Sequence, residues 1–247
     1  MKIIHISDLH IADNGEPIWG TDTKAHFDRA IEKISHEKDI DAIFITGDIA
    51  DNGAAWSYEY VDQAMFKLGI PTYVCPGNHD WGPTMCEKLK YCKMLKSETI
   101  GDWRFVFMDS TVIDPDDASK NKARGYFKNS DQQYLEFTLP ASDRPTCILL
   151  HHSPIEPGGW MNKKLLENRQ DFKEFISNYE SVKLVLFGHI HYPMTEVHNE
   201  VLYSSAPSIG FAFDKDMPKY QIMDNQEGYS IIHINTVNHI NIQTVRI

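Results

Sequence analysis

The chain has 247 residues, enough for one large α/β domain or two small ones and for an extensive hydrophobic core. Against 35 aspartates and glutamates it has only 24 lysines and arginines, and the formal net charge is −11. An acidic balance of this size argues against a surface for long nucleic acids or acidic lipids, although a local cationic pocket remains compatible with it.

Short apolar runs alternate with amphipathic stretches in the first part of the chain, which is typical of βα units. The second amphipathic stretch is followed by Gly69, a residue that commonly ends a helix. The periodicity predicts strands over 2–7, 42–46, 71–75 and 103–109, helices over 22–36, 55–68 and 83–95, and a polar loop over 114–124.

The second half of the chain begins with a short helix that Ser130 and Gln133 are expected to open as a capping box. Strands at 146–150 and 183–187 are predicted on either side of a helix at 165–177. From residue 196 onward, alternating β segments indicate a strand meander. We therefore expect a single domain over 1–247, with two packed mixed sheets and outer helices.

The four cysteines lie mostly in apolar runs and lack CxxC spacing, which predicts reduced thiols rather than a disulfide framework. The chain shows neither a secretory signal nor an 18-residue apolar stretch. We expect a cytoplasmic protein without membrane contact, and the sequence leaves a homo-oligomer open.

Clusters of ligand-type residues follow five of the predicted strands. Open α/β sheets place their ligands at the carboxyl ends of their strands, so these clusters should meet at one edge. Half of the twelve histidines lie in them, an arrangement that chance would rarely produce. The clusters read SDLH, TGDIAD, PGNHD, HHSP and GHIH.

The residue types in these clusters suit two divalent metal ions. Asp8 and His10 stand two apart at a strand end and can chelate one ion, and His189 and His191 repeat the device. Asp48 is the natural bridge, because one carboxylate has an oxygen for each of two cations. The remaining candidate ligands are Asn78 and His151, and mixed oxygen and nitrogen ligands favour Mn, Fe, Zn, Co or Ni.

Such a centre has the charge to attract an anionic substrate. Two divalent ions beside two aspartates and a bridging hydroxide leave a net charge of about +1, which one phosphodiester would neutralise. His79 is then free to protonate the departing alkoxide. Asp51 is the first candidate to orient His79, and Asp80 the second. Gly77 is expected to permit the backbone conformation that aims these side chains inward.

At this point the chain resembles the calcineurin-like metallophosphoesterases, whose motif order it carries between positions 8 and 191. The resemblance implies a four-layer α/β/β/α sandwich and a dinuclear site. One metal would be held by Asp8, His10, Asp48 and His191, and the other by Asp48, Asn78, His151 and His189. The choice of His151 over its neighbour His152 is an assumption.

Within that superfamily the chain is most similar to class III cyclic nucleotide phosphodiesterases and the glycerophosphodiesterase-like group, whose substrate loop resembles residues 151–172. The segment SAPSIGFAF, residues 205–213, resembles their later Pro-Ser turn. On this basis we expect Asn78, His79, Trp160 and Asn168 to lie near a substrate.

The leading hypothesis is hydrolysis of a small phosphodiester, with 3',5'-cAMP as the first guess, by attack of a metal-bridging hydroxide. A phosphomonoesterase, a glycerophosphodiesterase and a nuclease would use the same residues. An inactive interaction scaffold is an alternative of another class. It predicts eroded metal ligands, whereas all seven ligand positions are intact.

Overall fold

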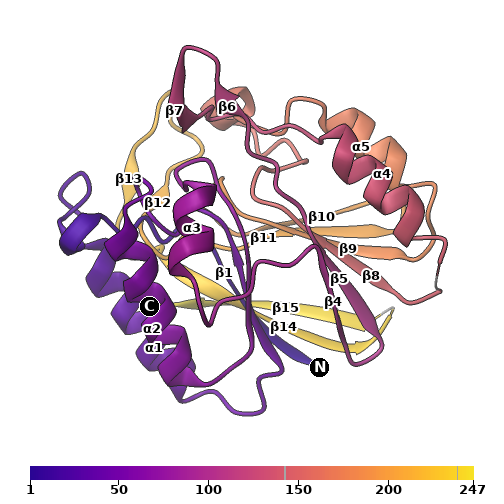
Figure 1. Ribbon diagram of the computed structural model, residues 1–247, viewed down its shortest axis with the longest axis horizontal. Coiled ribbons are helices and arrows are strands. Elements are labelled where there is room, and N and C mark those ends of the chain that lie inside the picture. Colours follow the sequence, from indigo (N-terminus) through magenta and orange to yellow (C-terminus); the bar gives the residue numbers. More distant parts are fainter. Residues whose placement is uncertain (142, 238) are drawn as a thin grey trace.

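The computed structural model describes residues 1–141, 143–237 and 239–247. Two large mixed sheets pack against each other, and helices lie on the outer side of each sheet (Figure 1). This is the four-layer arrangement expected from the sequence. The two sheets share a core. The assignment of a single domain over 1–247 is compatible with this core and stays a prediction.

The first sheet has the strand order β15-β14-β1-β2-β3. Strands β1, β2 and β3 are parallel to one another, and β14 and β15 add antiparallel neighbours. Helices α1, α2 and α3 lie on its outer side (Figure 1). The elements are β1 (Lys2–Ile6), α1 (Thr23–Ser35), β2 (Ala42–Thr46), α2 (Ala55–Leu68), β3 (Thr72–Cys75), α3 (Gly82–Lys88), β14 (Gly228–Thr236) and β15 (His239–Arg246).

The second sheet has the strand order β10-β11-β9-β8-β5-β4. Its four central strands are parallel, its two edge strands are antiparallel to their neighbours, and α4 and α5 cover its outer face. The elements are β4 (Ser97–Ile100), β5 (Trp103–Phe107), α4 (Asn129–Thr138), β8 (Thr146–Leu149), α5 (Arg169–Ile176), β9 (Val182–Phe187), β10 (Met194–His198) and β11 (Val201–Ser205).

Short elements complete the chain at the ends of the sheets. Two small hairpins and two 3-10 turns lie in the connections. They are η1 (Asp13–Gly15), β6 (Ile113–Asp114), β7 (Asp117–Asn121), η2 (Gly159–Lys163), β12 (Ala212–Phe213) and β13 (Ile222–Met223).

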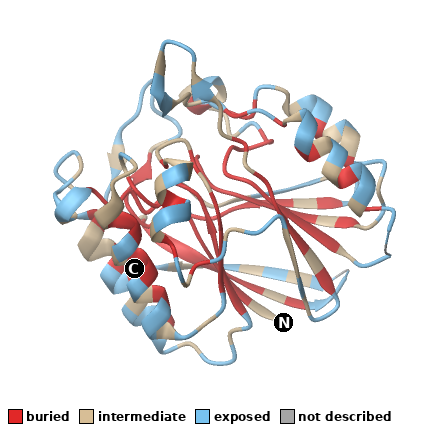
Figure 2. Cartoon of the chain, in the orientation of Figure 1, coloured by how far each residue is buried: buried red, intermediate tan, exposed pale blue. Residues whose placement is uncertain are grey.

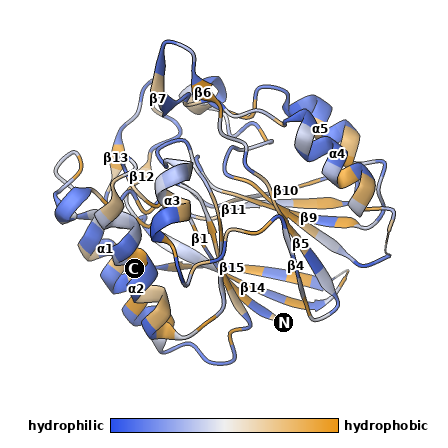
Figure 3. Cartoon of the chain, in the orientation of Figure 1, coloured by the Kyte–Doolittle hydropathy of each residue, from blue (hydrophilic) through white to orange (hydrophobic). Residues whose placement is uncertain are grey.

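Alternation along each strand divides the interior into three cores. On β1, Ile4 and Ile6 face helices α1 and α2, whereas Ile3 faces the second sheet. Phe44 on β2 and Phe105 on β5 meet in the core between the sheets, with ring centroids 4.8 Å apart. Figure 2 shows the buried strands through the centre, and Figure 3 shows polar residues on the outer sides of the helices.

The expected helix over 83–95 is wrong beyond residue 88. The chain becomes extended at Leu89, and residue Lys93 pairs with the edge of β3 through two backbone hydrogen bonds. The carboxylate of Asp62 also accepts the backbone N–H groups of Tyr91 and Cys92. These long-range hydrogen bonds outweigh the local helical pattern.

Three smaller expectations also need correction. The helix near residue 130 begins at Asn129, and no side chain caps it, so the predicted capping box does not form. Helix α5 starts at Arg169 rather than 165, because Leu165 and Leu166 form backbone hydrogen bonds with Gly125 and Ser153. Strand β4 was not predicted, and the polar loop over 114–124 contains β7.

One buried histidine gives the first testable prediction. His5 lies on β1 with no exposed surface, and its Nε2 is 2.8 Å from the Thr46 hydroxyl. Burial lowers its pKa from 6.5 to about 3, so it is neutral in the fold. The unfolded chain binds a proton at His5 below about pH 6.5, whereas the folded chain does not. The free energy of unfolding should therefore decrease as the pH is lowered below about 6.5.

We expect the unfolding free energy of the metal-free protein to drop by about 2 kcal/mol more between pH 7 and pH 5 than that of a His5→Leu variant. Urea unfolding at both pH values measures the difference. His36→Leu, at an exposed site on the end of α1, is the matched control and should behave as the parent. Equal losses in the parent and His5→Leu would show that His5 is not buried in its neutral form.

Candidate metal centre

The candidate ligands follow strands of both sheets rather than one sheet edge as expected: β1, β2 and β3 are parallel in the first sheet, and β8 and β9 are parallel in the second. Strand β1 is followed by Asp8 and His10, β2 by Asp48, β3 by Asn78, β8 by His151, and β9 by His189 and His191. Except for Asn78, which is half-buried, all of these side chains are buried. Two buried carboxylates and four buried imidazoles are costly to desolvate unless they bind something.

The four histidines face one another in two pairs. His10 Nε2 lies 3.2 Å from His191 Nε2, and His151 Nε2 lies 3.1 Å from His189 Nδ1. Both separations are short enough for a hydrogen bond. Whether each contact is attractive or repulsive depends on whether one of its two nitrogens carries a proton.

Each of these rings is held through its other nitrogen. His10 Nδ1 is 3.0 Å from a carboxylate oxygen of Asp51. The outer nitrogens of His151, His189 and His191 each lie 2.7 Å from a backbone carbonyl oxygen. A carbonyl only accepts, so these outer nitrogens donate, and the inner nitrogens of the neutral rings present lone pairs. Two facing lone pairs repel unless a proton or a metal cation lies between them, and metal-binding histidines are oriented in this way.

Oxygen atoms complete both groups. Asp8 Oδ1 lies 3.4 Å from His191 Nε2, and Asn78 Oδ1 lies 3.2 Å from His151 Nε2. Asp48 Oδ2 is 3.6 Å from His10 Nε2 and 3.3 Å from His151 Nε2, so it touches both groups. Ligand atoms about 2.1 Å from one ion lie about 3.0 to 3.4 Å apart, so these residues fit two cations with Asp48 between them.

The backbone at the site is strained in a way that the sequence did not reveal. Asp8, His10, Asp48, His189 and His191 all have φ between 47° and 71°, a region that non-glycine residues rarely occupy. Hydrogen bonds hold the loops in this conformation. The N–H of His10 donates to the Asp48 carbonyl, and the N–H of His189 donates to the Asp8 carboxylate. Strain of this kind concentrates at functional sites.

Two glycines make room for the carboxylates. A Cβ on Gly77 would lie 2.2 Å from Asp48 Oδ1, and a Cβ on Gly188 would lie 2.8 Å from Asp8 Oδ2. Gly77 does not have a positive φ, so the expectation of an unusual backbone there is wrong. The position requires glycine because the loop passes directly over Asp48.

The electrostatics also suit cations. Burial is the largest single influence and opposes charge on both Asp48 and His151, but their mutual attraction, neighbouring charges and hydrogen bonds together outweigh it: the pKa of Asp48 lies well below its usual range and that of His151 rises to about 9. Burial lowers the pKa of His189 to about 3, with the positive charge of His151 adding to the effect. The site thus holds a positive charge beside Asp48 even without metal, and metal binding should release a proton.

Asp51 and His79 contact each other, but not through the expected group. His79 Nδ1 lies 2.8 Å from the backbone carbonyl oxygen of Asp51 and 3.6 Å from its carboxylate. That carboxylate instead binds His10. The backbone N–H of His79 donates to Asp48 Oδ1, and the His79 side chain is 38% exposed. Its Nε2 is thereby left for a ligand.

Asp80, the second candidate to orient His79, has another use. Its carboxylate accepts the backbone N–H groups of Ile49, Ala50 and Gly77 and the hydroxyl of Tyr58. The Asp80 carboxylate therefore joins the loops after β2 and β3, and these partners do not include the His79 ring.

The two neighbouring histidines after β8 differ in their surroundings. His151 contacts Asp48, Asn78 and His189. His152 is also buried, but its Nδ1 pairs with the Ser110 hydroxyl, 2.8 Å away. His152 lies near His151 and His189 and could share an ion with them, but among the described residues no candidate metal group that contains Asp8 or Asp48 includes His152. The geometry supports His151 as the ligand.

Of the four residues expected near a substrate, Trp160 and Asn168 lie in different surroundings. Trp160 packs against Phe213, whose ring stacks on His191 at 4.4 Å, and so lies two ring contacts from the centre. The side chain of Asn168 instead exchanges two hydrogen bonds with the backbone of Phe127. We therefore leave Asn168 out of the proposed substrate site.

The segment SAPSIGFAF has a role in the centre that the sequence did not define. The Ser208 hydroxyl and the N–H of Gly210 both donate to the Asp8 carbonyl oxygen, at 2.8 and 2.9 Å. The Phe211 carbonyl accepts from His191. This segment thus fixes the loop after β1 and orients His191. In the sequence, Ser208 after Pro207 was the feature that could have indicated this role.

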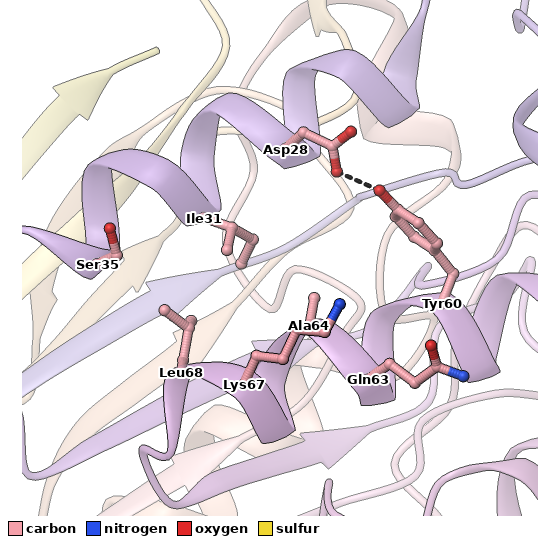
Figure 4. A pocket seen from close by; sticks show the side chains of 8 residues that line it. All are labelled: Asp28, Ile31, Ser35, Tyr60, Gln63, Ala64, Lys67 and Leu68. Atoms are coloured by element: carbon pink, nitrogen blue, oxygen red, sulfur yellow. Dashed lines mark hydrogen bonds between the residues drawn. The ribbon is translucent and has the colours of Figure 1, made fainter.

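A separate hollow lies between helices α1 and α2 (Figure 4). A hydrogen bond between Asp28 and Tyr60 crosses it. It contains none of the candidate ligands, so it is not the candidate metal centre. Its lining residues are Asp28, Ile31, Ser35, Tyr60, Gln63, Ala64, Lys67 and Leu68.

Comparison with known proteins identifies the class. The calcineurin-like phosphoesterase family matches residues 1–193. A 3',5'-cyclic-nucleotide phosphodiesterase of Nostoc is 30% identical over 95% of this chain and 88% of its own length. A 3',5'-cyclic adenosine monophosphate phosphodiesterase of Haemophilus influenzae is 26% identical over 100% of this chain and 90% of its own length.

The fold comparison agrees. A dimetal phosphatase from Danio rerio superposes with a TM-score of 0.73 over 100% of this chain and 96% of its own, at 13% identity. The chain belongs to the calcineurin-like phosphoesterase family. It is a metal-dependent phosphoesterase that uses two divalent ions. Across the part of the chain that the structure describes, no helix is long and apolar enough to cross a bilayer.

Proposed function

We propose that this phosphoesterase hydrolyses 3',5'-cyclic nucleotides, with 3',5'-cAMP as the first substrate, in the cytoplasm. The observation that carries the proposal is the pair of facing histidine couples with Asp48 between them. The names of the Nostoc and Haemophilus relatives support the substrate class. The acidic charge of −11 argues against a long nucleic acid.

The proposed division of labour follows from the contacts. Asp8, His10 and His191 would hold one cation, Asn78, His151 and His189 would hold the other, and Asp48 is placed to contact both. When bound, divalent ions would lower the pKa of a water molecule and offset the negative charge of the phosphoryl oxygens.

We infer that His79 serves the leaving group. Its Nδ1 donates to the Asp51 carbonyl, which orients the ring and leaves Nε2 available to a ligand. We assign Nε2 the transfer of a proton to the leaving alkoxide oxygen. Asp51 positions both His79 and His10, through its carbonyl and its carboxylate respectively.

A substrate panel tests the proposal. We expect the manganese-loaded protein to hydrolyse 3',5'-cAMP with a higher kcat/KM than glycerophosphocholine, 5'-AMP or single-stranded DNA. Product chromatography identifies the bond that breaks. Faster hydrolysis of glycerophosphocholine would assign a glycerophosphodiesterase, and faster hydrolysis of 5'-AMP a phosphomonoesterase. Either result would refute the proposed substrate.

A further inference from the structure

A row of aromatic rings leads from the metal centre to the surface. Phe211 packs on His10 and His191, with ring centroids 4.8 and 4.9 Å apart. Trp19 packs on the outer side of Phe211 at 5.2 Å, and Tyr220 stacks on Trp19 at 5.3 Å with an interplanar angle of 24°. The row therefore begins at two candidate ligands and ends at two outer rings.

The outer rings are exposed, unlike the inner one. Trp19 is 59% exposed and Tyr220 is 56% exposed, whereas Phe211 is buried. The buried ring of Phe211 packs its segment, residues 205–213, against the candidate metal centre. By contrast, Trp19 and Tyr220 each bury less than half of their surface. Large apolar side chains left exposed beside a site often mark a ligand surface.

The backbone at Trp19 gives an independent indication. Trp19 and Gly20 form the tip of a tight turn in which Ile18 and Thr21 exchange two backbone hydrogen bonds. Both tip residues have positive φ, 48° for Trp19 and 82° for Gly20. Asparagine, aspartate and glycine are the usual residues in such turns, and a bulky residue there is strained. The turn thus retains tryptophan at a conformational cost, and strain of this kind is found at functional sites.

The hairpin to which Tyr220 belongs holds it against Trp19. It lies in the loop between β12 and β13 (Figure 1), which the N–H of Asp214 closes by donating to the Gln221 carbonyl. The same loop contacts Trp160, whose ring lies 6.4 Å from Tyr220. Gly159 allows this contact, because a Cβ there would lie 2.3 Å from the Lys215 carbonyl oxygen.

We propose that Trp19 and Tyr220, with Trp160 beside them, form a stacking platform for the nucleobase of a nucleotide whose phosphate lies at the metal centre. The inference rests on the proposed function. A ribose separates phosphate and base in a nucleotide, and one buried ring, Phe211, separates Trp19 from His10. Every base has a π-face, so stacking on aromatic rings favours nucleotides over base-free phosphodiesters and discriminates little among bases.

Binding of the stable product analogue 5'-AMP tests the platform without requiring turnover. Stacking contributes about 1 to 3 kcal/mol per base, so we expect Trp19→Ala to raise the Kd of 5'-AMP by roughly 5- to 150-fold. The Kd of inorganic phosphate should not change. Calorimetry on the manganese-loaded protein gives both constants. Trp19→Phe should recover part of the affinity, and Phe137→Ala, at an 81% exposed site on α4, should match the parent.

Turnover supplies the second readout. Trp19→Ala should raise the KM for 3',5'-cAMP with little change in kcat, and should leave hydrolysis of glycerol 1,2-cyclic phosphate unaffected. An unchanged Kd for 5'-AMP, equal losses for 5'-AMP and phosphate, or a parent that fails to bind 5'-AMP would each overturn the platform. Failure of the proposed function is distinct: the parent would then bind 5'-AMP in a Trp19-dependent manner without hydrolysing 3',5'-cAMP.

Discussion

Asp48→Asn should reduce kcat/KM for 3',5'-cAMP by at least about 10³-fold, and the purified variant should retain fewer than two metal ions per chain. Asp48 is the carboxylate whose Oδ2 contacts a histidine of each couple, at 3.6 and 3.3 Å. An amide has one oxygen and no charge, so it cannot compensate two cations. Loss of a residue that only orients a ligand typically costs 10- to 100-fold, which is a smaller effect.

Two further variants isolate the role of Asp48. Asp51→Asn changes a carboxylate that contacts His10 from outside the ligand set, so we expect a 10- to 100-fold loss with both metals retained. Asp116→Asn, at an exposed site, should match the parent. Elemental analysis after gel filtration measures the metals. If Asp48→Asn kept two ions and most of its activity, the bridging role would be refuted.

His79→Ala should have the second largest effect, a fall in kcat for 3',5'-cAMP of about 10² to 10⁴-fold with unchanged metal content. The His79 ring binds the Asp51 carbonyl through Nδ1 and is partly exposed, so its removal leaves the candidate ligands in contact. The reason for the loss is that an alkoxide leaves poorly without a proton.

The leaving group gives this prediction a specific signature. Nitrophenolate departs without protonation, so His79→Ala should lose much less activity on bis(p-nitrophenyl) phosphate than on 3',5'-cAMP. His36→Ala, at the exposed end of α1, serves as the control. Equal losses on both substrates would mean that His79 binds the phosphoryl group rather than donating a proton to the leaving oxygen.

Periodicity predicted the parallel strands and the two long helices because both depend on local patterns. Helix α2, for example, ends at Gly69 in the left-handed conformation, as expected. The failures occurred where long-range hydrogen bonds decide the structure, as in the chain after Leu89, where Asp62 and the edge of β3 hold an extended segment.

Ligand-type residues after the strands predicted which side chains meet within each sheet, because the carboxyl ends of parallel strands lie together. The sequence did not show that two sheets contribute to the centre. The sequence could not show how each ring is held. The acceptors for His151, His189 and His191 are backbone carbonyls, and any residue type supplies a carbonyl. For the same reason, the contact between His79 and the Asp51 carbonyl could not be distinguished from one with the Asp51 carboxylate.

Anomalous diffraction from crystals soaked in manganese tests the central claim most directly. We expect two peaks about 3.5 to 4 Å apart, one between His10 and His191 and the other between His151 and His189, with Asp48 contacting both. A single peak, or manganese bound only elsewhere on the molecule, would contradict a dinuclear centre.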